Sequence, residues 1–267
     1  MDTHLLERKF ESMGARLKLR TLEGRVARNI LVDVRRDRKG EYFDVGVNAD
    51  VVRGVEVLDV RPKERHLLLM ARETQPGERT ERKNKFLCGH DERAWFVAAV
   101  PGQSASTVPT AMEALKPSVV RASQVRNGVR YDDRNRRKNR GFVRQGEWFF
   151  VPGRVYVPEG QIRRNEPMQR SGGKAHWAEF AFRTGGERVY VSARYPRGIG
   201  YEQYRSIIGE KPELVHAFRA MTRNATLYVR GRISHPDHKT IELRDWHRVM
   251  MNTEHESPAM RHVVFLD

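Results

Sequence analysis

Residues 175–194 read AHWAEFAFRTGGERVYVSAR, and this stretch decides the interpretation of the C-terminal half. Apolar side chains recur at alternate positions on both sides of Gly185-Gly186, which is the pattern of two half-buried strands. A Gly-Gly pair readily takes the positive φ values of a two-residue turn. The sequence therefore predicts a hairpin of 175–183 with 188–194, in which Phe182 faces Val189 and Phe180 faces Val191.

The other face of this predicted hairpin mixes cationic and aromatic side chains. It collects Trp177, Arg183, Arg188, Tyr190 and Arg194. A second predicted hairpin joins 227–233 to 241–249 through the loop 235–239, and its outer face holds Tyr228, Arg230, Arg244 and Trp246. Both faces are expected to set two arginines directly opposite each other, an arrangement that repels unless an anion lies over the pair.

Such a surface is suited to single-stranded nucleic acid. Guanidinium groups hold phosphates while aromatic rings stack on bases, at about 1–3 kcal/mol per stacked base. The signal lies on predicted strands and not on a recognition helix, which favours RNA or single strands over duplex DNA. The alternative is that a second layer, such as a predicted helix over 212–221, covers the aromatic rings. Exposure of these rings is therefore the decisive observation.

The composition also indicates an anionic partner. The chain of 267 residues has 50 Lys and Arg against 34 Asp and Glu, which gives a formal net charge of +16 and a pI of about 10.4. This charge exceeds what solubility requires and is typical of nucleic-acid-binding proteins. No run approaches the roughly 18 apolar residues that cross a membrane, so we expect no membrane partner. The single cysteine, Cys88, excludes an intramolecular disulfide and favours a cytoplasmic location.

The order of elements predicts an α+β fold, with a strand-rich N-terminal meander followed by a C-terminal antiparallel sheet of hairpins and a few short helices. We expect strands over 29–34, 42–47, 55–60, 66–70 and 95–100, and short helices over 1–14 and 108–115. The predicted domains are a strand-rich domain of residues 1–120, a basic linker or arm of 121–144, and an α+β domain of 145–267.

The basic linker shows the sharpest change of composition in the chain. Between Arg126 and Arg144 eight cationic residues are opposed only by Asp132 and Asp133. Such a run neutralises phosphates and makes binding strongly salt-dependent. We expect nucleic-acid contacts from Arg134, Arg136, Arg137, Lys138, Arg140 and Arg144. The alternatives are a solvated linker without a ligand, or a scaffold subunit whose protein partners in a larger nucleoprotein assembly order the arm.

Candidates for chemistry are few, and the sequence leaves open whether the protein is an enzyme. The densest titratable cluster consists of His235, Asp237 and His238. These residue types bind divalent metal ions, which would make the protein a metal-dependent nuclease or phosphodiesterase. His90 and Asp91 are candidates to complete that site, and Cys88 is a candidate nucleophile. The alternative for the cluster is an ordinary turn. Beyond such a metal ion we expect no cofactor, because phosphate-loop and dinucleotide-binding glycine patterns are missing from the sequence.

Overall fold

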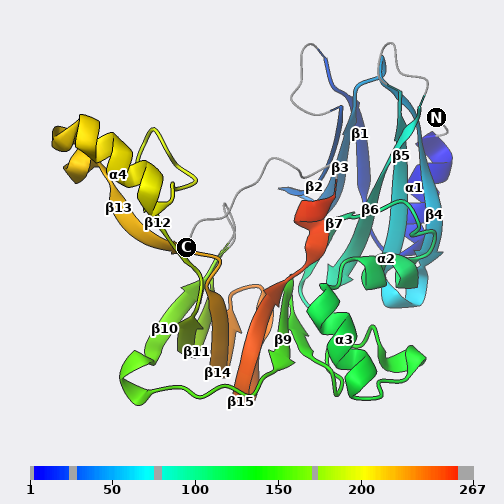
Figure 1. Cartoon of the computed structure of the whole chain (residues 1–267). Coiled ribbons are helices and arrows are strands. Elements are labelled where there is room, and N and C mark those ends of the chain that lie inside the picture. The colour runs from blue at the N-terminus through cyan, green and yellow to red at the C-terminus, as the bar shows by residue number, and fades with distance from the viewer. Residues whose placement is uncertain (1–2, 24–28, 75–79, 170–173, 258–267) are drawn as a thin grey trace. The chain divides into compact units, whose positions relative to one another are not determined.

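The computed structural model describes residues 3–23, 29–74, 80–169 and 174–257, and it confirms the α+β fold class (Figure 1). Its α-helices are α1 (Thr3–Ser12), α2 (Val108–Ala114), α3 (Ser118–Arg126) and α4 (Tyr201–Glu210). None of the helices in these ranges is long and apolar enough to cross a membrane. The chain divides into two compact units. The first runs to Phe149 and includes 237–239 and the segment from Met250, and the second holds Phe150–Pro236 and Thr240–Val249.

The first unit contains two sheets. A three-stranded sheet has the order β1-β3-β2 and consists of β1 (Leu17–Thr21), β2 (Ile30–Asp37) and β3 (Gly40–Val47). An antiparallel meander follows, with β4 (Val52–Arg61), β5 (His66–Glu73), β6 (Arg82–Asp91) and β7 (Ala94–Val100). The predicted strands and helices of this region are confirmed, although residues 1–2 of the predicted helix over 1–14 lie outside the described residues. The parallel pairing of β1 with β3 was not predicted.

The strand β5 lies at the centre of this unit because it is apolar on both faces. Leu67, Leu68 and Leu69 are all buried. Leu67 and Leu69 belong to a core that includes Phe43 of the three-stranded sheet, whereas Leu68 packs in a second cluster with Val108 of α2. A strand covered on both faces reads as a continuous apolar run instead of an alternating one.

Residues 121–144, predicted as a basic linker or arm, lie in the first unit by their contacts. The ammonium group of the buried Lys116 donates hydrogen bonds to the carbonyl oxygen of Arg134 and to Asn135 Oδ1, both at 2.8 Å. Gln124 Nε2 donates to the same carbonyl at 2.7 Å. The first compact unit ends its long N-terminal segment at Phe149. The predicted domain boundaries, 1–120, 121–144 and 145–267, remain a prediction.

The second unit is built on strands of a six-stranded sheet with the order β10-β11-β14-β15-β9-β8. The bounds are β8 (Val143–Gln145), β9 (Trp148–Pro152), β10 (Arg163–Met168), β11 (His176–Thr184), β14 (Thr226–His235) and β15 (His238–Met251). The predicted hairpin of 227–233 with 241–249 corresponds to β14 and β15, which are neighbours in this sheet. Its strands are longer than expected, and the turn between them contains only Pro236 and Asp237.

The hairpin predicted at Gly185-Gly186 is wrong. β11 pairs with β10 and β14, whereas β12 (Glu187–Val191) pairs with β13 (Arg219–Arg223). The register is the same before and after the glycines, since Thr184 lies opposite Thr226 and Glu187 lies opposite Arg223. The glycines have φ values of 68° and 88°, but they interrupt one long strand instead of reversing it.

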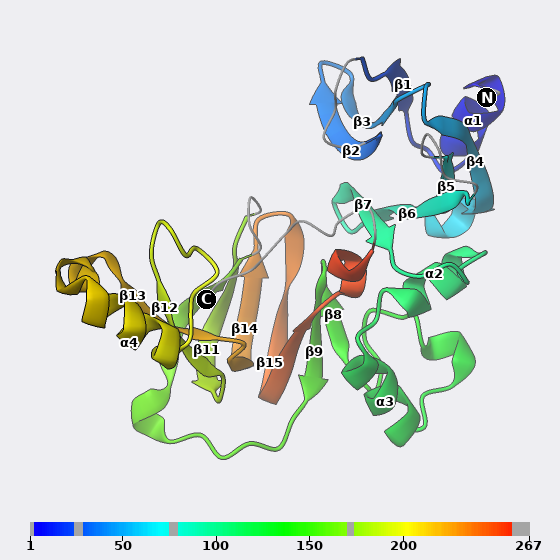
Figure 2. The same ribbon diagram turned by 45° about the horizontal axis from the view of Figure 1, so that its top comes forward.

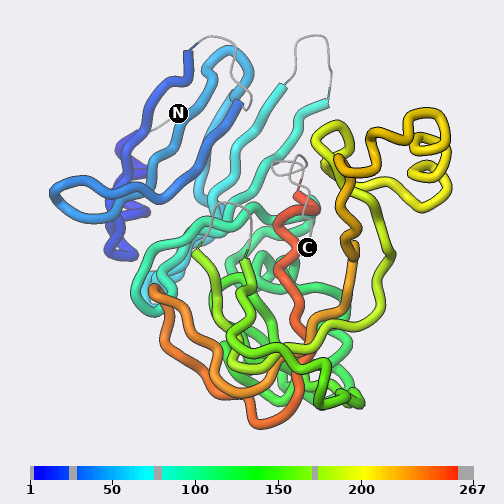
Figure 3. The backbone as a smooth tube through the Cα atoms, turned by 90° about the vertical axis from the view of Figure 1, so that its left-hand side faces the viewer, coloured from blue at the N-terminus to red at the C-terminus, as the bar shows by residue number. Residues whose placement is uncertain are grey.

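As a result, β12, β13 and α4 form a two-stranded extension of the second unit (Figures 2 and 3). The helix predicted over 212–221 is also wrong, because a 3-10 helix at Pro212–Ala217 is followed directly by β13. Pairing with β12 satisfies the backbone of this segment in an extended conformation, and tertiary pairing overrides the helical spacing of its apolar residues.

Candidate nucleic-acid interface and histidine cluster

Four arginine and aromatic side chains meet on the sheet of the second unit, and we call them the arginine–aromatic cluster: Arg164, Phe180, Arg230 and Trp246. The guanidinium carbon of Arg230 lies 5.5 Å from the ring centre of Phe180 and 5.1 Å from that of Trp246. The guanidinium carbon of Arg164 lies 5.1 Å from the Phe180 ring centre. Arg164 is exposed and the other three are half-buried, so solvent reaches the cluster.

A β-bulge sets the register that brings this cluster together. Just before Phe180, β14 carries one residue more than β11, which leaves Phe180 opposite Arg230. Gly231 in the bulge has a φ of +81°, a conformation that glycine adopts without steric cost. The carboxylate of Glu179 accepts a hydrogen bond from the backbone N–H of Arg232 at 2.9 Å and so holds the bulge.

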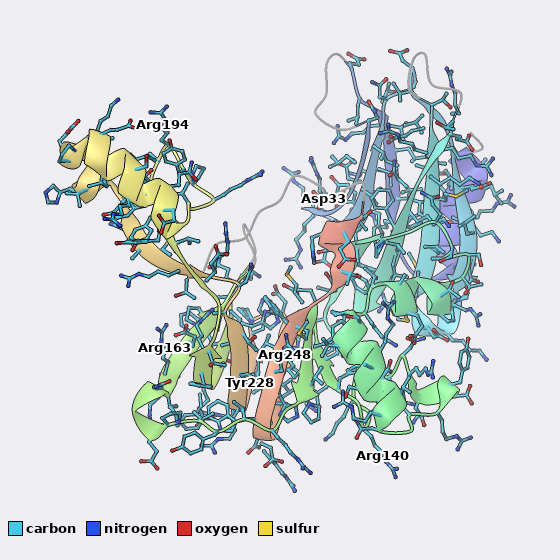
Figure 4. All side chains as sticks on the ribbon, viewed as in Figure 1. Asp33, Arg140, Arg163, Arg194, Tyr228 and Arg248 are labelled. Atoms are coloured by element: carbon cyan, nitrogen blue, oxygen red, sulfur yellow. The ribbon has the colours of Figure 1, made fainter. Side chains whose placement is uncertain are left out.

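Tyr228 borders the cluster on β14 and lies opposite Phe182 (Figure 4). Its ring is half-buried and lies close to Gly153, where an added Cβ would be 3.0 Å from the Cε1 atom of Tyr228. Trp177, at the start of β11, is 47% exposed. Of these four rings, Trp177 is well exposed, and Phe180, Tyr228 and Trp246 are half-buried. Trp177 and Phe180 lie on opposite faces of β11, because side chains alternate along a strand.

The arginine face predicted around Gly185-Gly186 is arranged differently from the prediction, whereas the opposition of Arg230 and Arg244 stays a prediction. Arg183 lies opposite Leu227, and its Nε atom is 3.1 Å from Glu166 Oε1. Arg188 lies opposite Thr222 in the β12–β13 pair. The predicted opposition of Arg183 and Arg188 is therefore wrong, because the Gly-Gly pair does not form a hairpin. The exposed Arg244 lies on β15.

The aromatic residues of the extension pack on one another. Tyr190 stacks on Tyr204 of α4, with ring centres 3.8 Å apart and an angle of 5° between the planes. Tyr195 similarly lies 6.1 Å from Phe218. Tyr190 is half-buried, and α4 covers it instead of the helix predicted over 212–221. Two predicted contact residues remain exposed beside this cluster: Arg188 and Arg194.

The predicted basic segment contains both ion-paired and exposed side chains. Arg137 forms ion pairs with Asp91 and Glu92, and Arg144 Nη2 lies 3.8 Å from Asp91 Oδ2. Both arginines are therefore engaged by acidic side chains of the first unit. The carbonyl oxygen of Arg134 accepts the hydrogen bonds described above. Of the six predicted contact residues of the segment, three are exposed: Arg136, Lys138 and Arg140. Arg136 also forms an ion pair with Asp133, with Nε 3.0 Å from Oδ1.

The three candidate catalytic residues are held by packing or by ion pairs. Cys88 is fully buried in the core, and burial raises the pKa of its thiol, so it packs as a small apolar residue. The ring of His90 lies 4.9 Å from that of Trp95 in an edge-to-face contact. Desolvation lowers the pKa of His90. Asp91 is held by Arg137, as described above.

Three histidines converge where β11, β14 and β15 meet. His176, His235 and His238 each offer a ring nitrogen, and these atoms all lie within 4.8 Å of one another. Two of them, His235 and His238, were predicted as metal ligands. Asp237 is not part of the group, nor are His90 and Asp91.

The sequence interpretation missed His176 because it paired β11 with the wrong strand. In the observed register Trp177 lies opposite Ser234, which places His176 beside His235. The alternating apolar pattern indicates that both segments are strands, but it does not indicate that they pair with each other. Desolvation lowers the pKa of His238, against a smaller opposing effect of nearby carboxylates.

Comparison with protein-family models, with curated proteins and with solved structures finds no match for this chain.

Proposed function

We propose that this protein binds single-stranded nucleic acid, RNA included, at the arginine–aromatic cluster of the second unit. The observation that carries the proposal is the position of Arg230, within cation–π distance of both Phe180 and Trp246. A guanidinium group fixed beside ring faces offers a phosphate ligand next to stacking surfaces. Bases stack on aromatic rings and on guanidinium planes alike.

The net charge of +16 supports the same proposal, because a polyanion is attracted to the whole chain before it reaches a specific surface. Further phosphate contacts would come from cationic side chains that are exposed outside the cluster: Arg136, Lys138, Arg140, Arg188, Arg194 and Arg244. Such contacts carry no base information, and each weakens as salt rises.

Fluorescence anisotropy with labelled single strands tests the proposal. Oligo-uridine, oligo-thymidine and a duplex of the same length would be titrated with the full-length protein at about 50 to 200 mM salt. We expect both single strands to bind more tightly than the duplex, with an affinity that falls linearly on a logarithmic salt axis. Undetectable binding of single strands at the lowest salt would refute the proposal and favour a scaffold role.

Paired variants distinguish binding at the arginine–aromatic cluster from binding through the overall positive charge. Arg230→Gln and Arg8→Gln each remove one positive charge, and Arg8 is an exposed residue of α1. Trp246→Leu and Tyr131→Leu each remove one ring, and Tyr131 is 73% exposed in the first unit. We expect Trp246→Leu to weaken binding about 5- to 150-fold, the equivalent of about 1–3 kcal/mol, with little effect of the controls. Equal effects within each pair would place binding elsewhere.

A further inference from the structure

We propose that His176, His235 and His238 bind a divalent transition-metal ion of the zinc type. The inference is independent of nucleic-acid binding, because it rests on a different set of side chains. Three ring nitrogens lie within 4.8 Å of one another. Tetrahedral zinc with bonds of about 2.05 Å requires nitrogens about 3.4 Å apart, so small ring rotations would complete the coordination.

Local structure fixes the position of each histidine. His176 and His235 are cross-strand neighbours at the paired ends of β11 and β14, and their rings stack with centres 4.1 Å apart. His238 follows after a turn of only Pro236 and Asp237. Proline sets φ for the first central position of such a turn, and the flanking residues of a β-turn lie less than about 7 Å apart. The short turn therefore holds His235 and His238 close together.

Burial supports a role beyond a solvated surface cluster. His176 is 1% exposed, and His235 and His238 are half-buried. Gathering three polar rings in a largely buried place costs desolvation, and a metal ion compensates for it by taking one nitrogen from each ring.

The donor set selects the class of metal. Imidazole nitrogen suits zinc, copper, nickel and iron, whereas magnesium and calcium require oxygen ligands. The group contains only imidazoles. Three protein ligands would leave the fourth tetrahedral position for water or another small ligand. The expected ion is therefore zinc or a close relative, and magnesium should not compete for it.

Metal titration of the untagged, chelator-treated full-length protein tests the proposal. We expect one equivalent of Zn²⁺ to bind in competition with a chromophoric chelator, and Co²⁺ alone to give the intense visible absorption of a tetrahedral site. Zn²⁺ should also raise the melting temperature. A large excess of Mg²⁺ should leave these signals unchanged.

Single substitutions assign the ligands. His238→Gln and His235→Gln should each weaken Zn²⁺ binding at least 100-fold and remove the Co²⁺ spectrum, while His216→Ala, at an exposed histidine of the extension, should leave both unchanged. Because His176→Ala alters a buried residue, its folding would be checked by circular dichroism before titration. Absence of stoichiometric binding in the natural sequence, or a full Co²⁺ spectrum in both glutamine variants, would overturn the proposal.

Discussion

Replacing Gly231 with alanine tests the β-bulge that aligns β11 with β14. An added Cβ would lie 2.7 Å from Glu179 Oε2 and 3.0 Å from Phe180 Cδ2. The φ of +81° costs a residue with a side chain about 1–2 kcal/mol. Displacing the Glu179 carboxylate from the Arg232 N–H costs about 1.5–3 kcal/mol, towards the lower end for a side chain that can partly adjust. We therefore expect the second unit to lose about 2–4 kcal/mol of unfolding free energy.

Hydrogen exchange read peptide by peptide, combined with urea denaturation of the full chain, measures this loss. With a slope of about 1–3 kcal/mol per molar urea, the midpoint of the second unit should fall by about 1–2 M. Gly209→Ala is the matched control, because Gly209 lies in α4 with no atom within 4 Å of an added Cβ. Unchanged exchange in the peptides of β11 and β14 of the Gly231→Ala variant would mean that the bulge does not require glycine at position 231.

Two further predictions concern buried polar groups. Burial lowers the pKa of His66 and His247, so the unfolded chain takes up protons below about pH 6.5 that the folded protein does not. The free energy of unfolding should be constant above that pH and should fall below it, by up to about 1.4 kcal/mol per pH unit for each histidine. His247→Gln should reduce this pH dependence, as measured by urea denaturation at a series of pH values. Lys116→Met should cost about 3–5 kcal/mol, since it leaves the Glu113 carboxylate without its buried cationic partner and Asn135 Oδ1 without the ammonium donor, while the Arg134 carbonyl keeps only the hydrogen bond from Gln124; an unchanged urea midpoint would contradict this.

Local patterns were enough to predict much of the fold. The strands β2, β3, β4, β5 and β7 of the first unit follow from alternating or continuous apolar runs between polar turns, and β14 and β15 follow from two such runs close together in sequence. Each of these predicted strands pairs with a near neighbour in the chain, so the shortest connection is also the observed one. The exception in the first unit is β1, which was not predicted and which pairs in parallel with β3. The turn of Pro236 and Asp237 adds the conformational preference that joins β14 to β15.

The pairing of β11 could not be predicted in this way. Gly185 and Gly186 permit positive φ, but that freedom serves equally for reversing a strand and for interrupting it. The real partner, β14, lies about 40 residues further along the chain, and only the tertiary structure selects it. The same error hid His176, whose place beside His235 depends entirely on this pairing.

Charge composition had a similar limit. It indicated an anionic partner, but it could not distinguish a cationic side chain that faces solvent from one engaged within the protein. Arg137 and Arg144 lie beside Asp91, a residue about 50 positions earlier in the chain. Lys138 and Arg140, in the same basic run, are exposed. The distinction depends on long-range packing, which residue counts do not contain.

The distance between the two proposed sites distinguishes simple binding of a nucleic-acid strand from metal-dependent cleavage of it. Because the extra residue of the bulge lies in β14, β11 keeps its alternation, and His176 shares a face with Phe180. Four residues along a strand span about 13 Å. At that distance a divalent ion attracts one phosphate by about 0.6 kcal/mol in water, and by about 0.2 kcal/mol after screening at 0.1 M salt.

A strand bound only at the arginine–aromatic cluster should therefore gain less than twofold in affinity when Zn²⁺ is added, and that is the result we expect, because His176 is buried. Anisotropy titrations with and without Zn²⁺ measure the gain, and His238→Gln supplies the metal-free control. By reciprocity, the strand would tighten Zn²⁺ binding by the same factor. A gain above tenfold that His238→Gln abolishes would mean that a phosphate contacts the metal, which is the arrangement that a nuclease requires.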